Sequence, residues 1–204
     1  MFEITGRQYK ALAEIAKAGK KSQFAQLANS VALIDGQLLF SDSHMLVCIE
    51  DDSLTSMSNV VYGNCMSEKV KVADRVQFLG DGDLKVGDKE GRVWNDVACE
   101  MVGMSSDSTS NMLYRTCSNL IEKQKFTSDA SLIAIDPKQL GIISQIFCDF
   151  GLRMGVEILE GNKTTTGECC PVPVYKFYSY KEVSQGKQPG FHITAFIMGL
   201  NECI

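Results

Sequence analysis

Two stretches far apart in the 204-residue chain share one pattern: ITGRQYKALAEIAKAG at residues 4–19 and IDPKQLGIISQIFCDFG at residues 135–151. In each, a short apolar run precedes a segment whose apolar residues recur every three or four positions, which is typical of an amphipathic helix. The two stretches match at five pairs of positions, and the two residues of each pair are 131 positions apart in the chain. These pairs are Ile4 and Ile135, Arg7 and Lys138, Gln8 and Gln139, Leu12 and Ile143, and Ile15 and Ile146. The pattern predicts one strand–helix unit near each end of the chain.

Glycine, proline and aspartate indicate where these helices begin and end. We expect the first strand at residues 2–5 and the first helix at 7–18, between Gly6 and Gly19. We expect the second strand at 131–136, followed by a helix that Asp136 caps, with Pro137 in its first turn. Gly151 ends that helix.

The segments after both helices predict antiparallel strands. VALIDGQLLF, residues 31–40, contains two apolar runs joined at Asp35-Gly36, where both residues tolerate positive φ, and this predicts a hairpin. HMLVCIE at 44–50 predicts a third strand. After the second helix, three further strands are expected in RMGVEILEG (153–161), PVYKFYSYKE (173–182) and GFHITAFIMGL (190–200). Two amphipathic units can also resemble each other by chance, and that alternative stays open.

The middle of the chain consists of short apolar runs separated by glycines. We expect antiparallel hairpins in EKVKV (68–72), RVQFL (75–79), DLKVG (83–87) and GRVWN (91–95). GMSSDSTS, residues 103–110, is the candidate linker, and a helix is expected at 111–125. The predicted fold is α+β, with duplicated βαβββ units, antiparallel sheets joined edge to edge and both helices on one face. The predicted parts are an N-terminal half (1–102), a linker and helix (103–130) and a C-terminal half (131–204).

Positive charge is concentrated on the first helix, although the whole chain has a net charge of −5 and a pI near 5.1. Residues 6–21 contain Arg7, Lys10, Lys17, Lys20 and Lys21 against the single acid Glu14. Such a stripe can contact phosphates while the rest of the surface stays acidic. The alternative is that these cations only solvate the outer side of an amphipathic helix. The corresponding positions of the second helix, Lys138, Gly141, Gln145 and Asp149, are close to neutral.

The sequence contains no strong pattern for catalysis or for metal binding. The eight cysteines have no CxxC spacing, and we interpret most of them as small buried apolar residues. A nucleophile assembled from His44, Asp42 and Cys48 or Cys65 is conceivable, but no neighbour that would lower a thiol pKa is evident. Nucleotide-binding glycine motifs are missing, and GDGDLKVGDKEG (80–91) departs from a calcium loop. We therefore expect no cofactor and no metal.

The aromatic run at 175–180 and the hydropathy of the chain bear on its partners. Tyr175, Phe177, Tyr178 and Tyr180 could stack nucleic-acid bases, but aromatic strand residues more often form the core and the sheet surface. No stretch approaches the roughly 20 apolar residues of a membrane span, and the N-terminus does not resemble a signal peptide. We expect a soluble cytoplasmic protein without a membrane partner.

The N-terminal residues resemble the first domain of the bacterial DNA-polymerase sliding clamps. FEITGRQYKALAEIAKAG (2–19) is similar to the opening strand and helix of that family, and LANSVALIDGQLLFSDSHMLVCI (27–49) follows its next segment, including Asp42 at the family's aspartate. SLIAIDPKQLGIISQIF (131–147) and FIMGL (196–200) are similar more loosely. Residues 51–130 show no such similarity, and the chain has room for about one and a half clamp domains.

This resemblance implies a non-enzymatic processivity or docking factor for DNA replication, with a polymerase as a protein partner and self-association as a homo-oligomer. It also implies that Arg7, Lys10, Lys17, Lys20 and Lys21 contact the DNA backbone without reading bases. A clamp-like or unrelated scaffold that binds protein and no DNA is the second hypothesis. A small cysteine-dependent enzyme is the third.

Overall fold

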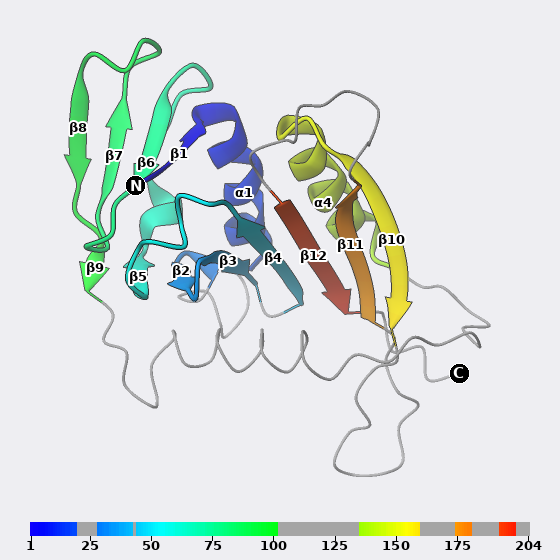
Figure 1. Ribbon diagram of the computed structural model, residues 1–204. Coiled ribbons are helices and arrows are strands. Elements are labelled where there is room, and N and C mark those ends of the chain that lie inside the picture. The colour runs from blue at the N-terminus through cyan, green and yellow to red at the C-terminus, as the bar shows by residue number, and fades with distance from the viewer. Residues whose placement is uncertain (20–27, 43, 102–134, 160–173, 181–191, 199–204) are drawn as a thin grey trace.

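The computed structural model describes residues 1–19, 28–42, 44–101, 135–159, 174–180 and 192–198. These residues form an α+β fold with a four-stranded sheet, an eight-stranded sheet and two α-helices (Figure 1). All strand pairs are antiparallel. None of the helices in these ranges is long and apolar enough to cross a membrane.

The first series of elements begins at the N-terminus with strand β1 (Phe2–Thr5), helix α1 (Gly6–Gly19) and strands β2 (Val31–Ile34), β3 (Gln37–Ser41) and β4 (Met45–Glu50). The start of α1 is fixed by a capping box, in which the hydroxyl of Thr5 accepts from Gln8 N and the Gln8 amide oxygen accepts from Thr5 N at 2.8 Å. Asp35 and Gly36 both have positive φ, so the expected β2–β3 hairpin is confirmed.

A second series follows with strand β5 (Val60–Gly63), the 3₁₀ turn η1 (Cys65–Ser67) and strands β6 (Arg75–Phe78), β7 (Leu84–Gly87) and β8 (Trp94–Val97). The two series exchange their first strands, since β1 pairs with β6 and β5 pairs with β2. The resulting strand orders, β1-β6-β7-β8 and β5-β2-β3-β4, correspond to each other. The three-residue turn η1 stands where the first series has the helix α1.

A third series consists of helix α4 (Pro137–Asp149) and strands β10 (Arg153–Leu159), β11 (Val174–Tyr180) and β12 (His192–Met198). Asp136 caps α4 as expected, because its carboxylate accepts from Lys138 N at 2.8 Å. Gly151 has φ +67 directly after the helix, which confirms the predicted end. The short strand β9 (Glu100–Met101) pairs with β5 and completes the larger sheet.

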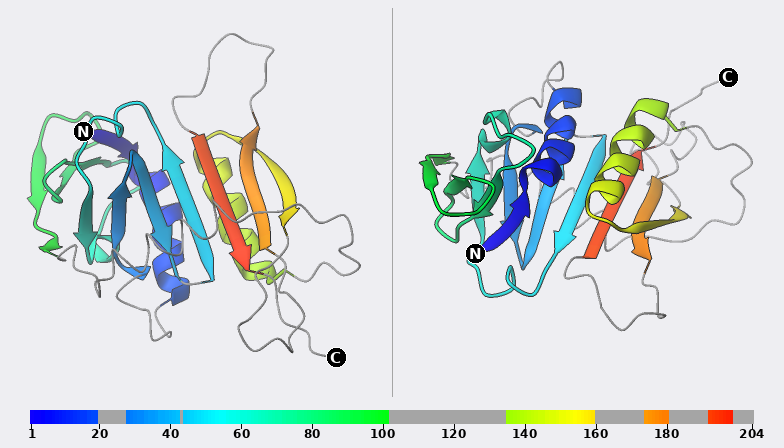
Figure 2. Two further views of the ribbon diagram at one scale, coloured as in Figure 1. Left: turned by 60° about the horizontal axis from the view of Figure 1, so that its bottom comes forward. Right: turned by 90° about the horizontal axis from the view of Figure 1, so that it is seen from above.

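Strands β12 and β4 join the first and third series into one sheet of order β10-β11-β12-β4-β3-β2-β5-β9. Helices α1 and α4 contact each other and cover the same face of this sheet (Figure 2). The main core lies between the helices and the sheets, and a smaller cluster of buried apolar residues belongs to the opposite face. The edge-to-edge layout expected from the sequence is therefore present, whereas the duplication that suggested it stays a hypothesis.

Several local predictions were wrong. EKVKV (68–72) forms no strand, because Val70 is buried whereas Val72 is exposed, and neither residue is part of a ladder. The strand β5 was not predicted, GRVWN becomes a strand only from Trp94, and α1 includes both Gly6 and Gly19. The predicted linker (103–110), the helix at 111–125 and residues 131–134 of the predicted strand 131–136 lie outside the described residues, and Ile135 and Asp136 are not in a strand.

Two helix glycines allow a matched test of packing against this fold. A Cβ atom at Gly6 would lie 1.9 Å from the carbonyl oxygen of Lys71, whereas a Cβ at Gly141 would meet nothing within 4 Å. We expect Gly6→Ala to lower the free energy of unfolding by about 1–3 kcal/mol, because the backbone must shift. Gly141→Ala should raise it by about 0.5–1 kcal/mol through helix propensity. Urea unfolding of both variants checks this, and equal effects would contradict the close approach at Gly6.

Candidate nucleic-acid interface

The outer side of α1 carries the row of cations that the sequence predicts, called the cationic stripe below. Tyr9, Leu12, Ala13 and Ala16 are buried against the core, as their spacing indicates. Arg7, Lys10 and Lys17 are exposed on the other side, and Glu14 is half-buried among them. Arg7 and Lys17 are ten residues apart, so the stripe runs about 15 Å along the helix axis.

Arg7 is held by an acid from the other helix. Its Nε lies 2.7 Å from Oδ1 of Asp149, at the last position of α4. The Asp149 side chain is only 6% exposed, whereas that of Arg7 is 64% exposed. Arg7 therefore already has a carboxylate partner, and a phosphate would have to share it with or take it from Asp149.

The remaining α1 cations differ in how free they are to meet a ligand. Lys17 forms an ion pair with Glu14, one turn away on the same helix. This pair is solvent-exposed and contributes little, so a phosphate can replace Glu14 at small cost. Lys10 is exposed, and no ion-pair partner for it is found among the described residues. The two other predicted contacts, Lys20 and Lys21, lie outside those residues.

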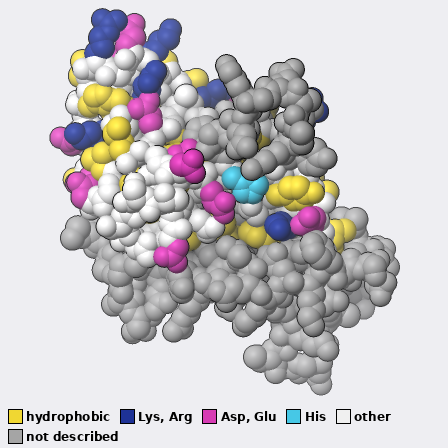
Figure 3. All heavy atoms as spheres, viewed as in Figure 1, with side chains coloured by type: hydrophobic (Ala, Val, Ile, Leu, Met, Phe, Trp, Pro, Cys, Tyr) yellow, Lys and Arg dark blue, Asp and Glu magenta, His cyan; other side chains and the backbone are white. Residues whose placement is uncertain are grey.

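The neighbouring helix α4 adds little positive charge to this layer. Its exposed positions include Lys138, Gly141, Ser144, Gln145 and Cys148, so Lys138 supplies its only cation. On the opposite face of the molecule, Lys and Arg side chains gather mainly over the turns of the β6–β8 sheet, and acidic side chains lie across the middle (Figure 3). The layer formed by α1 and α4 is thus net positive, but less positive charge is available in it than the number of cations in residues 6–21 implies.

Two described thiols, the candidate nucleophile Cys65 and also Cys99, are in surroundings that do not favour a nucleophile. Burial raises the pKa of the Cys65 thiol well above its ordinary value. Burial, with a contribution from Asp83, also raises the pKa of Cys99 to about 12. The Tyr9 hydroxyl donates to the carbonyl oxygen of Cys65, and burial raises the pKa of that phenol too. These groups are protonated at neutral pH, which is the opposite of what a nucleophilic thiol requires.

Asp42 and His44 do not form a carboxylate–imidazole pair that could act as a general base for such a thiol. The Asp42 carboxylate is buried and accepts from the backbone nitrogens of His44 and Met45, at 2.9 and 2.6 Å. His44 was predicted inside a strand, but it is exposed in the turn before β4. Asp42, the position that resembles the clamp family's aspartate, therefore shapes the β3–β4 turn.

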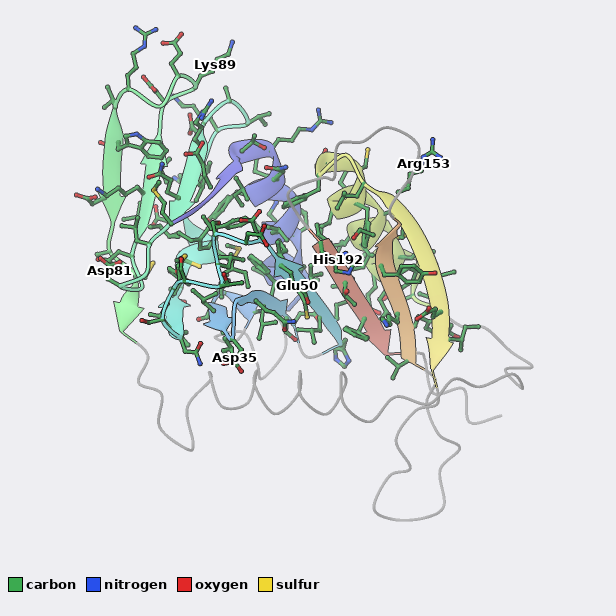
Figure 4. All side chains as sticks on the ribbon, viewed as in Figure 1. Asp35, Glu50, Asp81, Lys89, Arg153 and His192 are labelled. Carbon is green, nitrogen blue, oxygen red and sulfur yellow. The ribbon has the colours of Figure 1, made fainter. Side chains whose placement is uncertain are left out.

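A polar cluster at the start of β12 was not predicted. His192 Nδ1 lies 2.7 Å from the hydroxyl of Ser179, which also accepts from Ile193 N at 3.2 Å. Across the β4–β12 ladder from His192 stands Glu50, whose carboxylate accepts from Gln37 at 2.7 Å (Figure 4). Ser179 is 6% exposed and already engaged by the backbone, so this arrangement serves the strand pairing. No cluster of metal ligands is found in the part of the chain that the structure describes.

The aromatic strand β11 belongs to the core on one side. Tyr175 and Phe177 are buried in the main core, while Tyr178 is half-buried on the other side with its ring over Gly155. The interpretation of these residues as core is thus confirmed for Tyr175 and Phe177.

Two features of this interface were missed in the sequence, and only one of them had a signal there. The capping box Thr5-x-x-Gln8 could have been recognised from its spacing. The pairing of Arg7 with Asp149 joins residues from opposite ends of the chain and has no local signature.

No protein-family model matches the chain, and no curated protein matches its sequence.

The cysteine environments predict an order of alkylation. At pH 8, a thiol with a pKa of about 12 has roughly one part in ten thousand as thiolate. Of the three described cysteines Cys148, Cys99 and Cys65, we expect iodoacetamide to modify exposed Cys148 first, Cys99 much more slowly and buried Cys65 only on unfolding. Peptide mass spectrometry over a time course measures this order. Modification of Cys65 before Cys148 in the folded protein would revive the idea of an activated thiol.

Proposed function

We propose that this chain is a non-enzymatic, sliding-clamp-like factor that associates with DNA in the cytoplasm and serves DNA replication as a processivity or docking element. In this proposal, it self-associates as a homo-oligomer and recruits a protein partner such as a polymerase. The observation that carries the proposal is the layer of two adjacent helices on one face of a continuous antiparallel sheet, with the cationic stripe of α1 directed outward.

The electrostatics of the layer support contact with the phosphate backbone. The two helices together contain four cations, Arg7, Lys10, Lys17 and Lys138, and two carboxylates, Glu14 and Asp149. This local excess of positive charge stands out in a chain of net charge −5. Because the cations are spread along the outer sides of the helices and are not arranged around a base-reading group, they suit sequence-independent, salt-sensitive binding.

The second candidate is a scaffold with the same fold that binds protein and no DNA. Its support is that two of the three described α1 cations already have carboxylate partners, Asp149 for Arg7 and Glu14 for Lys17. An ion pair of this kind is also what ordinary helix solvation produces.

Charge reversal on α1 tests the DNA contact. We expect Lys10→Glu with Lys17→Glu to abolish retention on duplex DNA at about 50 mM salt, and each lost phosphate contact to reduce the slope of log K against log salt by about 0.9. Fluorescence anisotropy with two unrelated duplexes measures this. The control is Lys69→Glu with Lys89→Glu, which makes the same charge change at two exposed positions elsewhere. Equal losses in the two double variants would show only a net-charge effect, and no retention of the unchanged protein would favour the scaffold.

The Arg7–Asp149 pair provides a test in which the affinity for DNA is expected to rise and not to fall. Asp149→Asn removes the carboxylate that neutralises Arg7 and leaves a side chain of similar size. We expect the affinity for duplex DNA to rise severalfold at low salt, because Arg7 becomes available to a phosphate. Asp96→Asn, which removes the partner of Lys85 on the small sheet, is the matched control and should leave the affinity nearly unchanged. An unchanged affinity in Asp149→Asn would place Arg7 outside the DNA contact.

A further inference from the structure

The second series leaves the eight-stranded sheet and returns to it through two short connections. It leaves after β5, through Asn64 and the turn η1, and it returns between β8 and β9, through Ala98 and Cys99. Strands β6, β7 and β8 of the four-stranded sheet lie between these two connections in the chain. Each connection contains one cysteine, Cys65 in the first and Cys99 in the second. A bond between the two sulfurs would therefore close the base of the β6–β8 unit.

The pairing of β5 with β9 brings the two connections together. The last pair of this ladder joins Gly63 to Glu100. The next step along both strands sets Asn64 opposite Cys99, and Cys65 follows directly. Facing Cα atoms of an antiparallel pair are about 4.5–5.5 Å apart, and neighbours along a chain are about 3.8 Å apart. Positions one step out of register are thus roughly 6 Å apart, within the span of about 4.4–6.8 Å that a disulfide bridges.

Both thiol side chains face the main core. Cys65 is 2% exposed within that core, and Cys99 is half-buried and packs against it. Burial, and next the neighbouring Cys99, raise the pKa of the Cys65 thiol. Burial is also the main cause that raises the pKa of the Tyr9 and Tyr62 phenols, and both thiols add to that rise. Since such electrostatic effects act at short range, the two sulfurs lie near each other and near the same two rings.

The two thiols differ in their access to solvent, and this difference sets the order in which they can react. The half-buried Cys99 thiol donates only a long, weak hydrogen bond to the carbonyl oxygen of Val97, at 3.9 Å. Cys65 is shielded from a dissolved oxidant but not from a neighbouring sulfur. An oxidant therefore meets Cys99 first, and Cys65 then reacts with the oxidised Cys99.

We propose that Cys65 and Cys99 form a disulfide when the protein meets a peroxide, and that this bond closes the base of the β6–β8 unit. The Cys99 thiolate attacks one oxygen of hydrogen peroxide, the O–O bond breaks, and a sulfenic acid forms as hydroxide leaves. The Cys65 thiolate then attacks the Cys99 sulfur, the S–S bond forms, the S–O bond breaks, and a second hydroxide leaves. The protons of the two thiols convert both hydroxides to water. Two thiols are thus oxidised by two electrons, and one peroxide is reduced to two waters. The bond does not require DNA binding, so it is tested separately from the proposed function.

The surroundings of the thiols make this oxidation slow and dependent on pH. Burial raises the pKa of Cys99 to about 12, so its thiolate fraction rises about tenfold with each pH unit below that value. The thiolate is the attacking species. The rate of disulfide formation should therefore rise about tenfold between pH 8 and pH 9.

Peptide mapping after treatment with hydrogen peroxide tests the bond. Trypsin together with the protease Glu-C, which cuts after Glu50, separates Cys65 from Cys48. We expect monomeric protein to yield one peptide pair linked between residues 65 and 99, at a rate that follows pH as above. The matched control Cys148→Ser, which removes an exposed thiol, should give the same pair, and Cys99→Ser should give none. Oxidised Cys99 that stays unlinked, or a link that forms only in urea-unfolded protein, would overturn the proposal.

Thermal unfolding tests the effect of the bond on the fold. Closing the segment 65–99 removes conformational freedom from the unfolded chain, so the oxidised protein should melt about 5–10 °C higher than the reduced protein. Dithiothreitol should reverse the shift. Cys65→Ala, measured before and after the same treatment, should show no shift. A linked protein that melts at or below the temperature of the reduced protein would show that the native fold does not accommodate the bond, and would overturn the proposal.

Discussion

The antiparallel pairing of β4 with β12 is the contact on which the rest of the structure depends. It joins strands from opposite ends of the chain, and Val47, Ile49, Ile193 and Ala195 within it are fully buried. Through this ladder α4 comes to lie against α1, and Asp149 comes within reach of Arg7. The helix layer and the pairing of charges within it both follow from this one long-range strand pairing.

The sequence predicted those parts of the fold that have a local cause. Asp35-Gly36 indicates a hairpin because only a few residues tolerate positive φ, and Asp136-Pro137 indicates a helix start because both residues suit a first turn. The strand β5 (Val60–Gly63) is a short run without polar alternation, and such a run cannot be assigned from its period alone. Charged and apolar side chains alternate in residues 68–72 as they do in a strand, but a loop can show the same alternation. Only pairing with a neighbouring strand distinguishes the two.

The candidate interface likewise has one part that a local sequence pattern predicts and one part that depends on tertiary contacts. Helical periodicity is enough to place Arg7, Lys10 and Lys17 on the outer side of α1, because the buried side is defined by Leu12 and its neighbours. The charge that remains available is not a property of the helix alone. Asp149 reaches Arg7 only because the sheet brings the two helices together, and no local pattern in the chain encodes that approach.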